Sequence, residues 1–121
     1  MYRCEVQIMY DYISIHSIDY KNKVKSKDLE QYLTCDLGLI KESHLKFYKI
    51  INQVFVRVNG ILARKDGSYA YDSLDGIEEI NLIEIDVPSE IDHILEQELA
   101  DMANAIAKNC SWIIDDDHGL E

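Results

Sequence analysis

The chain has 121 residues, of which 47% are hydrophobic and 29% charged, and its formal net charge is −11 at pH 7. This length suits a single domain over residues 1–121, and the composition is that of a globular protein rather than a disordered one. The sequence lacks any apolar run near the ~18 residues of a membrane span and any secretory leader pattern at its start. A cytoplasmic location is therefore expected, and Leu120-Glu121 fit a cloning remnant.

The negative charge belongs almost entirely to the second half of the chain. Residues 1–65 hold 7 acidic and 11 basic side chains, a balance of +4, whereas residues 66–121 hold 16 acidic side chains and the single base Lys108, a balance of −15, which together give −11. A field of one sign attracts partners of the opposite sign and repels nucleic acids and anionic membranes. The sequence therefore favours a basic partner, although the basic half can neutralise part of the acidic half by folding against it.

The three cysteines, Cys4, Cys35 and Cys110, lie far apart in the chain. An odd number without CxxC spacing argues against a disulfide framework and against a structural zinc site. Buried free thiols in a reducing compartment are expected.

The first third of the chain predicts a strand followed by a short helix. Residues 3–9 alternate between apolar and polar side chains, as in a half-buried strand, and this strand is expected to continue through residues 10–15 and in extended form to residues 18–20. Ser26 fits the N-cap of a helix over residues 27–35, and Gly38 fits its end. Before this helix, lysines at spacing two predict an exposed basic turn: Lys21, Lys23, Lys25 and Lys27.

Residues 41–52 are ambiguous. The spacing of Leu45, Tyr48 and Ile51 fits a helix, whereas Leu45 and Phe47 alternate as in a strand. Helix is the favoured interpretation.

The middle of the chain predicts a β-meander. Asn59-Gly60 lies between the β-rich runs VFVRV and ILARK, and Asn-Gly readily adopts the positive φ angles of a type I′ hairpin turn. Asp66-Gly67 and Asp75-Gly76 precede further β-rich runs. The pattern predicts antiparallel strands near residues 53–58, 61–65, 68–72 and 77–87.

The clearest helix lies near the C-terminus, in SEIDHILEQELADMANAIAKNC. Ser89 with Asp92 resembles a capping box at the start of this helix. After its end, Trp112, Ile113 and Ile114 predict a short strand. The expected fold is α+β, with an antiparallel meander sheet, helices packed on one face, and a long C-terminal amphipathic helix before the final strand. The apolar face of that helix is expected to comprise Ile91, Ile94, Leu95, Leu99, Met102, Ile106 and Cys110.

Glu98 falls inside this apolar sector on a helical wheel. A buried carboxylate without a partner destabilises a fold and changes its own pKa, so such groups sometimes mark functional sites. The structural alternative, which is favoured, is that Glu98 lies at the edge of the sector or pairs with an Arg or Tyr side chain, with Arg57 and Arg64 as the candidate partners.

The segment Asp115-Asp116-Asp117-His118 is the other cluster of candidate ligands. Only Asp115 and Asp117 share a face of an extended segment, and the Ca²⁺-loop pattern is absent. A solvated strand end is therefore favoured over an acidic contact surface, and both over a metal site. The sequence also lacks HExxH, GxSxG, GxxxxGK[ST] and GxGxxG, so neither an enzyme nor a cofactor is predicted.

The candidate partner-binding residues come from three acidic segments. Tyr69 and Tyr71 share a strand face beside Asp72 in SYAYDS, and tyrosines beside acids suit a contact with a basic protein. The alternatives are that both rings belong to the core and that the acids form a solvated face. The predicted contact residues are Tyr69, Tyr71, Asp72, Glu90, Glu96, Asp101, Asp115, Asp116 and Asp117.

The acidic residues 66–121, the tyrosines of SYAYDS and the DDDH segment resemble the immunity proteins of bacterial toxin systems. The resemblance is one of overall character and includes no family motif, so it assigns no site residue. It implies a non-enzymatic inhibitor, a monomer or weak dimer, that neutralises a basic toxin, such as a nuclease, by covering its active site.

The alternative function is that of a small accessory or regulatory domain that binds a peptide or self-associates through a sheet edge. A third, least favoured interpretation is a metal-assisted enzyme that uses Asp115, Asp117 and His118.

Overall fold

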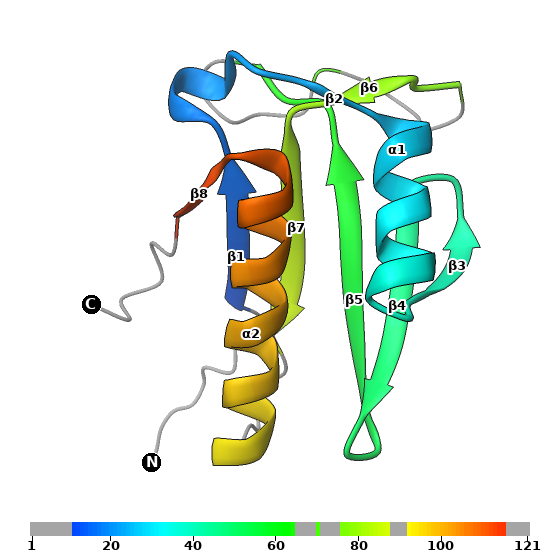
Figure 1. Cartoon of the computed structure of the whole chain (residues 1–121), viewed down its shortest axis with the longest axis vertical. Coiled ribbons are helices and arrows are strands. Elements are labelled where there is room, and N and C mark those ends of the chain that lie inside the picture. Colours follow the sequence, from blue (N-terminus) through cyan, green and yellow to red (C-terminus); the bar gives the residue numbers. More distant parts are fainter. Residues whose placement is uncertain (1–10, 65–69, 71–75, 88–91, 116–121) are drawn as a thin grey trace.

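The computed structural model describes residues 11–64, 70, 76–87 and 92–115, and these form one sheet covered by two helices, with a second, smaller sheet at one end (Figure 1). The strands and helices are β1 (Asp11–His16), β2 (Val24–Lys25), α1 (Ser26–Gln31), β3 (Ile40–Ser43), β4 (Lys46–Ile51), β5 (Val54–Ile61), β6 (Glu79–Ile80), β7 (Leu82–Val87), α2 (His93–Cys110) and β8 (Ile113–Asp115).

The main sheet has six strands in the order β3-β4-β5-β7-β1-β8, and every neighbouring pair is antiparallel. Strands β2 and β6 form the small sheet. Both helices pack on the same face of the main sheet, α1 over β4 and β5 and α2 over β1 and β7 (Figure 1). The predicted α+β fold is therefore confirmed, with the helices on one face and a short strand after the long C-terminal helix.

The hydrophobic core lies between the sheet and the two helices. Alternate residues of each strand point into it, as in the register pairs Ile15↔Ile83 and Val58↔Ile85. The helices contribute the opposite wall with buried Leu29, Leu33, Leu95, Leu99, Met102 and Ile106, of which the last four belong to the apolar face that the sequence predicted. Within the part of the chain that the structure describes, no helix is long and apolar enough to cross a membrane.

The prediction of a helix over residues 41–52 is wrong, because this segment forms most of β3 and all of β4. Strands β4 and β5 are joined by a tight turn at Asn52 and Gln53, whose φ angles are 51° and 69°. Two successive positive φ angles characterise a type I′ hairpin turn. The chain thus makes this turn seven residues before the Asn-Gly pair that predicted it.

The predicted turn at Asn59-Gly60 is also wrong, because both residues lie inside β5. Gly60 is buried there and donates its backbone N–H to the carbonyl of Leu45 at 2.8 Å. A Cβ atom at position 60 would lie 3.0 Å from Leu45 Cδ2, 3.3 Å from Ile80 Cδ1 and 3.4 Å from Leu29 Cδ2. The glycine therefore serves close packing rather than a turn. Strand β5 continues through the predicted turn but ends at Ile61, so residues 62–64 do not form the predicted strand 61–65, whose last residue lies outside the described part of the chain.

The predicted strand 77–87 is interrupted, because Asn81 separates β6 from β7. The buried Asn81 side chain accepts from the backbone N–H of Ala63 at 2.7 Å and donates to the carbonyls of Ala63 and Tyr20 at 2.9 and 3.1 Å. These bonds tie three separate segments together at the end of the sheet. The predicted strands 3–9 and 68–72 fall outside the described residues, apart from Ala70.

Two further expectations fail near α1. Residues 18–20 form a 3₁₀ turn rather than a strand, with Asp19 and Tyr20 at φ angles of 59° and 56°. Ser26 is not the N-cap of α1; Lys25 occupies that position, and the Ser26 hydroxyl donates to the carbonyl of Ile77 at 2.9 Å. The helix itself is confirmed, although its last turn over residues 32–36 is π-helical.

Asp92 is the N-cap of α2, and its side chain accepts from the backbone N–H of Leu95 at 2.7 Å, so the predicted capping box, which placed Asp92 inside the helix, is wrong. Ser89 and Ile91 of the predicted helix fall outside the described residues. Ile94 is 62% exposed and so does not belong to the buried face. Burial raises the pKa of the partly buried Cys110 thiol to about 11. Cys35, by contrast, is exposed, so the prediction of a buried thiol is wrong there.

We expect Gly60→Ala to lower the free energy of unfolding by about 1 kcal/mol. Overpacking by one methyl group destabilises a core by ~1–3 kcal/mol, which exceeds the ~0.4–1 kcal/mol gained because the unfolded chain loses freedom. Urea denaturation followed by circular dichroism measures the difference.

The matched control is Gln53→Gly at the turn that the chain uses. Removing the side chain at φ 69° relieves a left-handed conformation, so the variant is expected to be more stable by about 0.5–1 kcal/mol. A Gly60→Ala variant that is more stable than the parent, together with a Gln53→Gly variant that is less stable, would contradict the assigned positions of the turn and the close contact.

Candidate partner-binding face

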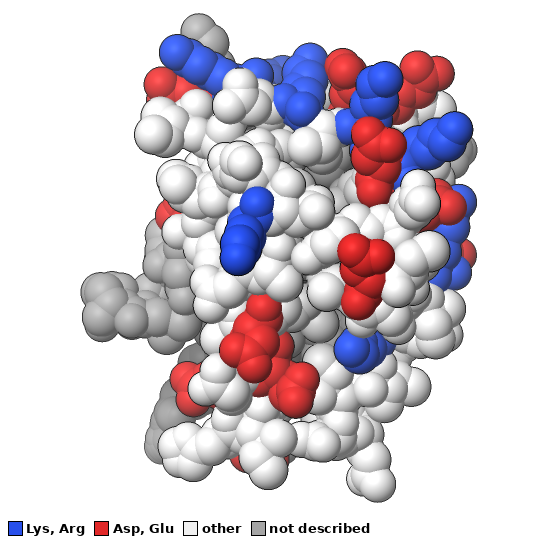
Figure 2. All heavy atoms as spheres, in the orientation of Figure 1, with Lys and Arg blue, Asp and Glu red and all other residues white. Residues whose placement is uncertain are grey.

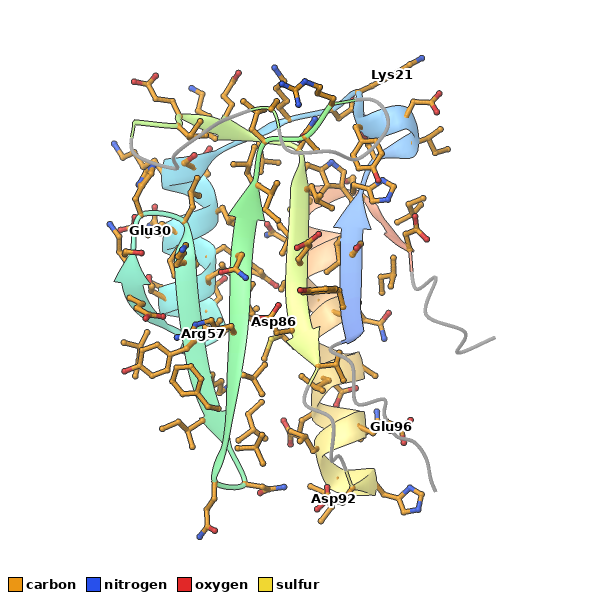
Figure 3. The ribbon with its side chains drawn as sticks, turned by 180° about the vertical axis from the view of Figure 1, so that it is seen from behind. Lys21, Glu30, Arg57, Asp86, Asp92 and Glu96 are labelled. Atoms are coloured by element: carbon orange, nitrogen blue, oxygen red, sulfur yellow. The ribbon has the colours of Figure 1, made fainter. Side chains whose placement is uncertain are left out.

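Among the described residues, no helix covers one face of the main sheet, and we call this face the open face (Figure 3). Because side chains alternate along a strand, every second residue of β3, β4, β5, β7, β1 and β8 points to this side. The register pairs Tyr48↔Arg57, Tyr12↔Asp86 and Ser14↔Asp115 lie on it. The open face is therefore the largest part of the sheet whose side chains are not packed beneath α1 or α2.

Apolar side chains gather on the open face over β3, β4 and β5. Ile40, Ile50 and Phe55 are 52%, 61% and 46% exposed, and Tyr48 is partly buried between them. The rings of Tyr48 and Phe55 stack with their centroids 4.7 Å apart and an interplanar angle of 23°. We call these four residues the aromatic patch. Antiparallel sheets usually turn a polar face to water, so this patch is unusual for its position.

Arg57 borders the aromatic patch and is held in place on two sides. Its guanidinium donates to the Glu42 carboxylate from Nε at 3.2 Å and from Nη2 at 3.3 Å. The same guanidinium lies 4.9 Å from the centroid of the Phe55 ring, within the range of a cation–π contact. Two hydrogen bonds and one ring contact thus orient this cation across β3 and β5.

Asp86 lies beside Arg57 on the neighbouring strand β7 (Figure 3). Its carboxyl group is half-buried, and burial raises its pKa, while the charge of Arg57 lowers it by a smaller amount. Tyr12, directly opposite Asp86 on β1, is 37% exposed. The open face therefore holds the partly desolvated carboxyl group of Asp86 between Tyr12 on one side and the aromatic patch on the other.

The far end of the open face is closed by His16 on β1 and Asp115 on β8. His16 Nε2 lies 3.1 Å from Asp115 Oδ2, and Nδ1 lies 2.7 Å from the carbonyl of Ser17. The imidazole, 5% exposed, also stacks on the Tyr20 ring at 4.1 Å. Asp115 is thus engaged within the protein and helps to hold the last strand on the sheet.

The structure describes three of the sequence-predicted contact residues, Glu96, Asp101 and Asp115, and it does not bring all three together. Glu96 and Asp101 are exposed on α2, where acidic side chains gather over the lower part of the helix (Figure 2). Asp115 lies on the open face, on the other side of the sheet. The remaining predicted contact residues fall outside the described part of the chain: Tyr69, Tyr71, Asp72, Glu90, Asp116 and Asp117.

The prediction that Glu98 lies in the apolar sector of α2 is wrong, because its side chain is exposed. It does not pair with Arg57, whose guanidinium is bound to Glu42. The buried face of α2 is narrower than the helical wheel suggested, since Ile94 is also exposed. Among the described residues, no group of three His, Cys, Asp or Glu side chains is placed to hold a metal ion.

The sequence interpretation missed the aromatic patch because it assigned residues 41–52 to a helix. The usable signal was the alternation in KFYKII, where Phe47 and Ile51 point to the core and Tyr48 and Ile50 point outward. Because both sets contain apolar residues, the strand does not show the polar–apolar alternation that normally reveals one.

We expect Asp86→Asn to be at least as stable as the parent protein at pH 7. Since the folded state raises the pKa of this carboxyl, it binds the proton more tightly than the unfolded chain does. The free energy of unfolding therefore falls as pH rises from the ordinary value of 3.8 through the raised pKa. Urea denaturation between pH 3 and pH 7 should show that the free energy of unfolding of the variant, relative to that of the parent, increases as pH rises. A relative free energy that decreases with rising pH would contradict the desolvation of Asp86.

Comparison of the chain with protein-family models, with curated proteins and with solved structures finds no match. The groups that bear on function are those that the fold itself brings together: the aromatic patch, the Arg57–Glu42 pair and the half-buried Asp86.

Proposed function

We propose that this domain is a non-enzymatic inhibitor that binds a basic protein through the open face of its sheet. The observation that carries the proposal is the aromatic patch, in which Ile50 and Phe55 are 61% and 46% exposed. The solvent-exposed face of an antiparallel sheet usually carries polar side chains instead. Exposed apolar residues with a charged rim mark protein-binding surfaces, and aromatic and arginine side chains dominate the energetics of such contacts.

Charge complementarity supports a basic partner. Glu84 and Asp86 lie on the middle strand of the open face, and the nearby cation Arg57 is already engaged by Glu42. Burial disfavours the ionised form of Asp86 in the free protein. An arginine or lysine from a partner would stabilise that form, because an opposite charge a few ångströms away offsets the loss of water.

Attraction and anchoring are separate roles in this proposal. The net charge of −11, together with acids on α2 such as Glu96 and Asp101, attracts a basic protein over long range and raises the association rate. The aromatic patch excludes water and determines how slowly the complex dissociates. The acids of α2 thus contribute to binding without direct contact.

The immunity proteins that this chain resembles supply the kind of partner. By that resemblance the basic protein is a toxin, such as a nuclease, and the domain inhibits it by covering its active site. The proposal places the domain in the cytoplasm as a monomer or weak dimer that binds neither nucleic acid nor membrane.

A second candidate function rests on the edge of the sheet. Among the described strands, β3 pairs with β4 alone, and all four of its residues are exposed. An exposed edge strand can pair with a peptide or a second copy. A stable homodimer in solution that is lost when Pro replaces Lys41 would favour this function over the first.

We expect the double variant Ile50→Ala, Phe55→Ala to lose the partner. Truncating two central anchors typically weakens a protein complex by ~2 kcal/mol or more, which is about 30-fold in the dissociation constant. The wild-type and variant domains, each immobilised, are incubated with lysate of the source cell, and the retained proteins are identified by mass spectrometry. The purified partner is then titrated against both domains.

The matched control is Ile94→Ala, because Ile94 on α2 is 62% exposed and Ile50 on the open face is 61% exposed. The control should retain the partner, and raising the salt concentration should slow association in all three proteins. Loss of binding in the control alone would move the contact to α2. Co-expression completes the test, since a partner whose toxicity the domain does not relieve is not the target of an inhibitor.

A further inference from the structure

A groove lined by lysines lies at the end of the molecule formed by β2, β6 and the start of α1. It has a volume of about 1000 Å³, and its lining includes Lys23, Lys25, Lys27, Lys41 and His44. Figure 2 shows lysine and carboxylate side chains gathered over this end. The volume is at the upper end of the range for small-molecule sites. We call this feature the lysine groove.

The lysines lie together because of how β2 is held. Val24 is partly buried against the core and pairs with Ile80 of β6, so the neighbouring Lys23 and Lys25 point away from the core. The next residue fixes the segment, since the Ser26 N–H donates to the carbonyl of Glu78 at 2.8 Å and the Ser26 hydroxyl donates to Ile77. The backbone that carries the lysines is therefore anchored on both sides.

The opposite wall of the lysine groove is also fixed. His44 Nε2 lies 2.7 Å from the carbonyl of Ile77, which places the ring against the same segment that holds Ser26. Lys41 on β3 forms an ion pair with Glu30 of α1 at 3.0 Å. This pair neutralises one lysine and one carboxylate of the lining.

The other three lysines are not neutralised in this way. Within the described residues, no carboxylate lies at ion-pair distance from Lys23, Lys25 or Lys27. Glu78 and Glu79 also line the groove, so a ligand with one negative charge gains little net attraction. A ligand with several negative charges can contact more than one of these lysines at once, and it gains from each contact even though Glu79 lies opposite Lys25 in the β2–β6 register.

We propose that the lysine groove binds a small phosphorylated molecule that carries at least two phosphates. Three lysines that line one groove without an ion-pair partner among the described residues are suited to phosphate oxygens, whose charge-assisted hydrogen bonds are about twice as strong as neutral ones. The remaining length of the groove, which includes Leu62 and Ile77, can accommodate an uncharged part of the ligand. This site lies away from the aromatic patch and does not depend on the proposed partner.

The test is isothermal titration of the full chain with inorganic tripolyphosphate at low salt, repeated with Lys25→Gln, Lys27→Gln. Saturable binding to the wild-type protein, weakened about tenfold in this double variant, is the expected result. The control Lys46→Gln, Lys108→Gln removes the same charge from exposed lysines outside the groove and should change the affinity less than about twofold. Circular dichroism verifies that both variants are folded.

No saturable binding, or an equal loss in both double variants, would overturn the proposal and leave the lysines as charges that protect the edges of β2 and β6 from pairing. Two further ligands identify the source of the phosphates. Tighter binding of ATP than of tripolyphosphate indicates a nucleotide, and equal binding indicates the phosphate chain alone. A short single-stranded oligonucleotide that binds more tightly than either would overturn the small-molecule site in favour of a nucleic-acid surface.

The same titration with the Ile50→Ala, Phe55→Ala variant separates the two proposals. This variant should bind tripolyphosphate as the wild-type protein does, because none of its changes lies in the lining of the groove.

Discussion

The burial of one face of the six-stranded sheet beneath two helices is the interaction on which the rest of this structure depends. It uses one set of alternating side chains for the core and leaves the other set to solvent, so a strand residue is either structural or available for contact. Apolar burial is the main favourable term in folding. Apolar residues left on the open face, such as Ile50 and Phe55, therefore contribute little to stability, and the proposed protein contact rests on them.

The sequence predicted those parts of the fold whose pattern had only one interpretation. Helix α2 shows apolar residues at helical spacing, and this pattern predicted the helix. Its N-cap is Asp92, which the sequence interpretation had placed inside the helix as the partner of Ser89. The Asn-Gly pair at residues 59–60 failed because a glycine can serve either a turn or a close contact, and only the neighbouring Leu45, Ile80 and Leu29 side chains decide between them. Those neighbours come from three other segments, so local sequence does not contain the answer.

The open face could not be located from the sequence. Aromatic side chains beside acids were the expected contact at Tyr69, Tyr71 and Asp72, which lie outside the described residues, and the open face carries the same combination at Tyr12, Phe55 and Asp86. The position depends on strand register, since β5 and β7 become neighbours only after the chain between them has folded back. The Arg57–Glu42 pair likewise joins residues 15 apart in the chain, across β4.

The place of β1 in the sheet has a consequence for synthesis on the ribosome. The first described strand lies between β7 and β8, so both of its partners are made much later. Strands β3, β4 and β5 pair with their neighbours in sequence and can fold as soon as they emerge, together with α1. Residues 11–16 must wait, with their apolar side chains exposed, until β7 has been synthesised and β8 closes the edge. Since contacts between distant segments slow folding and prolong that exposure, this strand is where chaperone binding or aggregation of the nascent chain should begin.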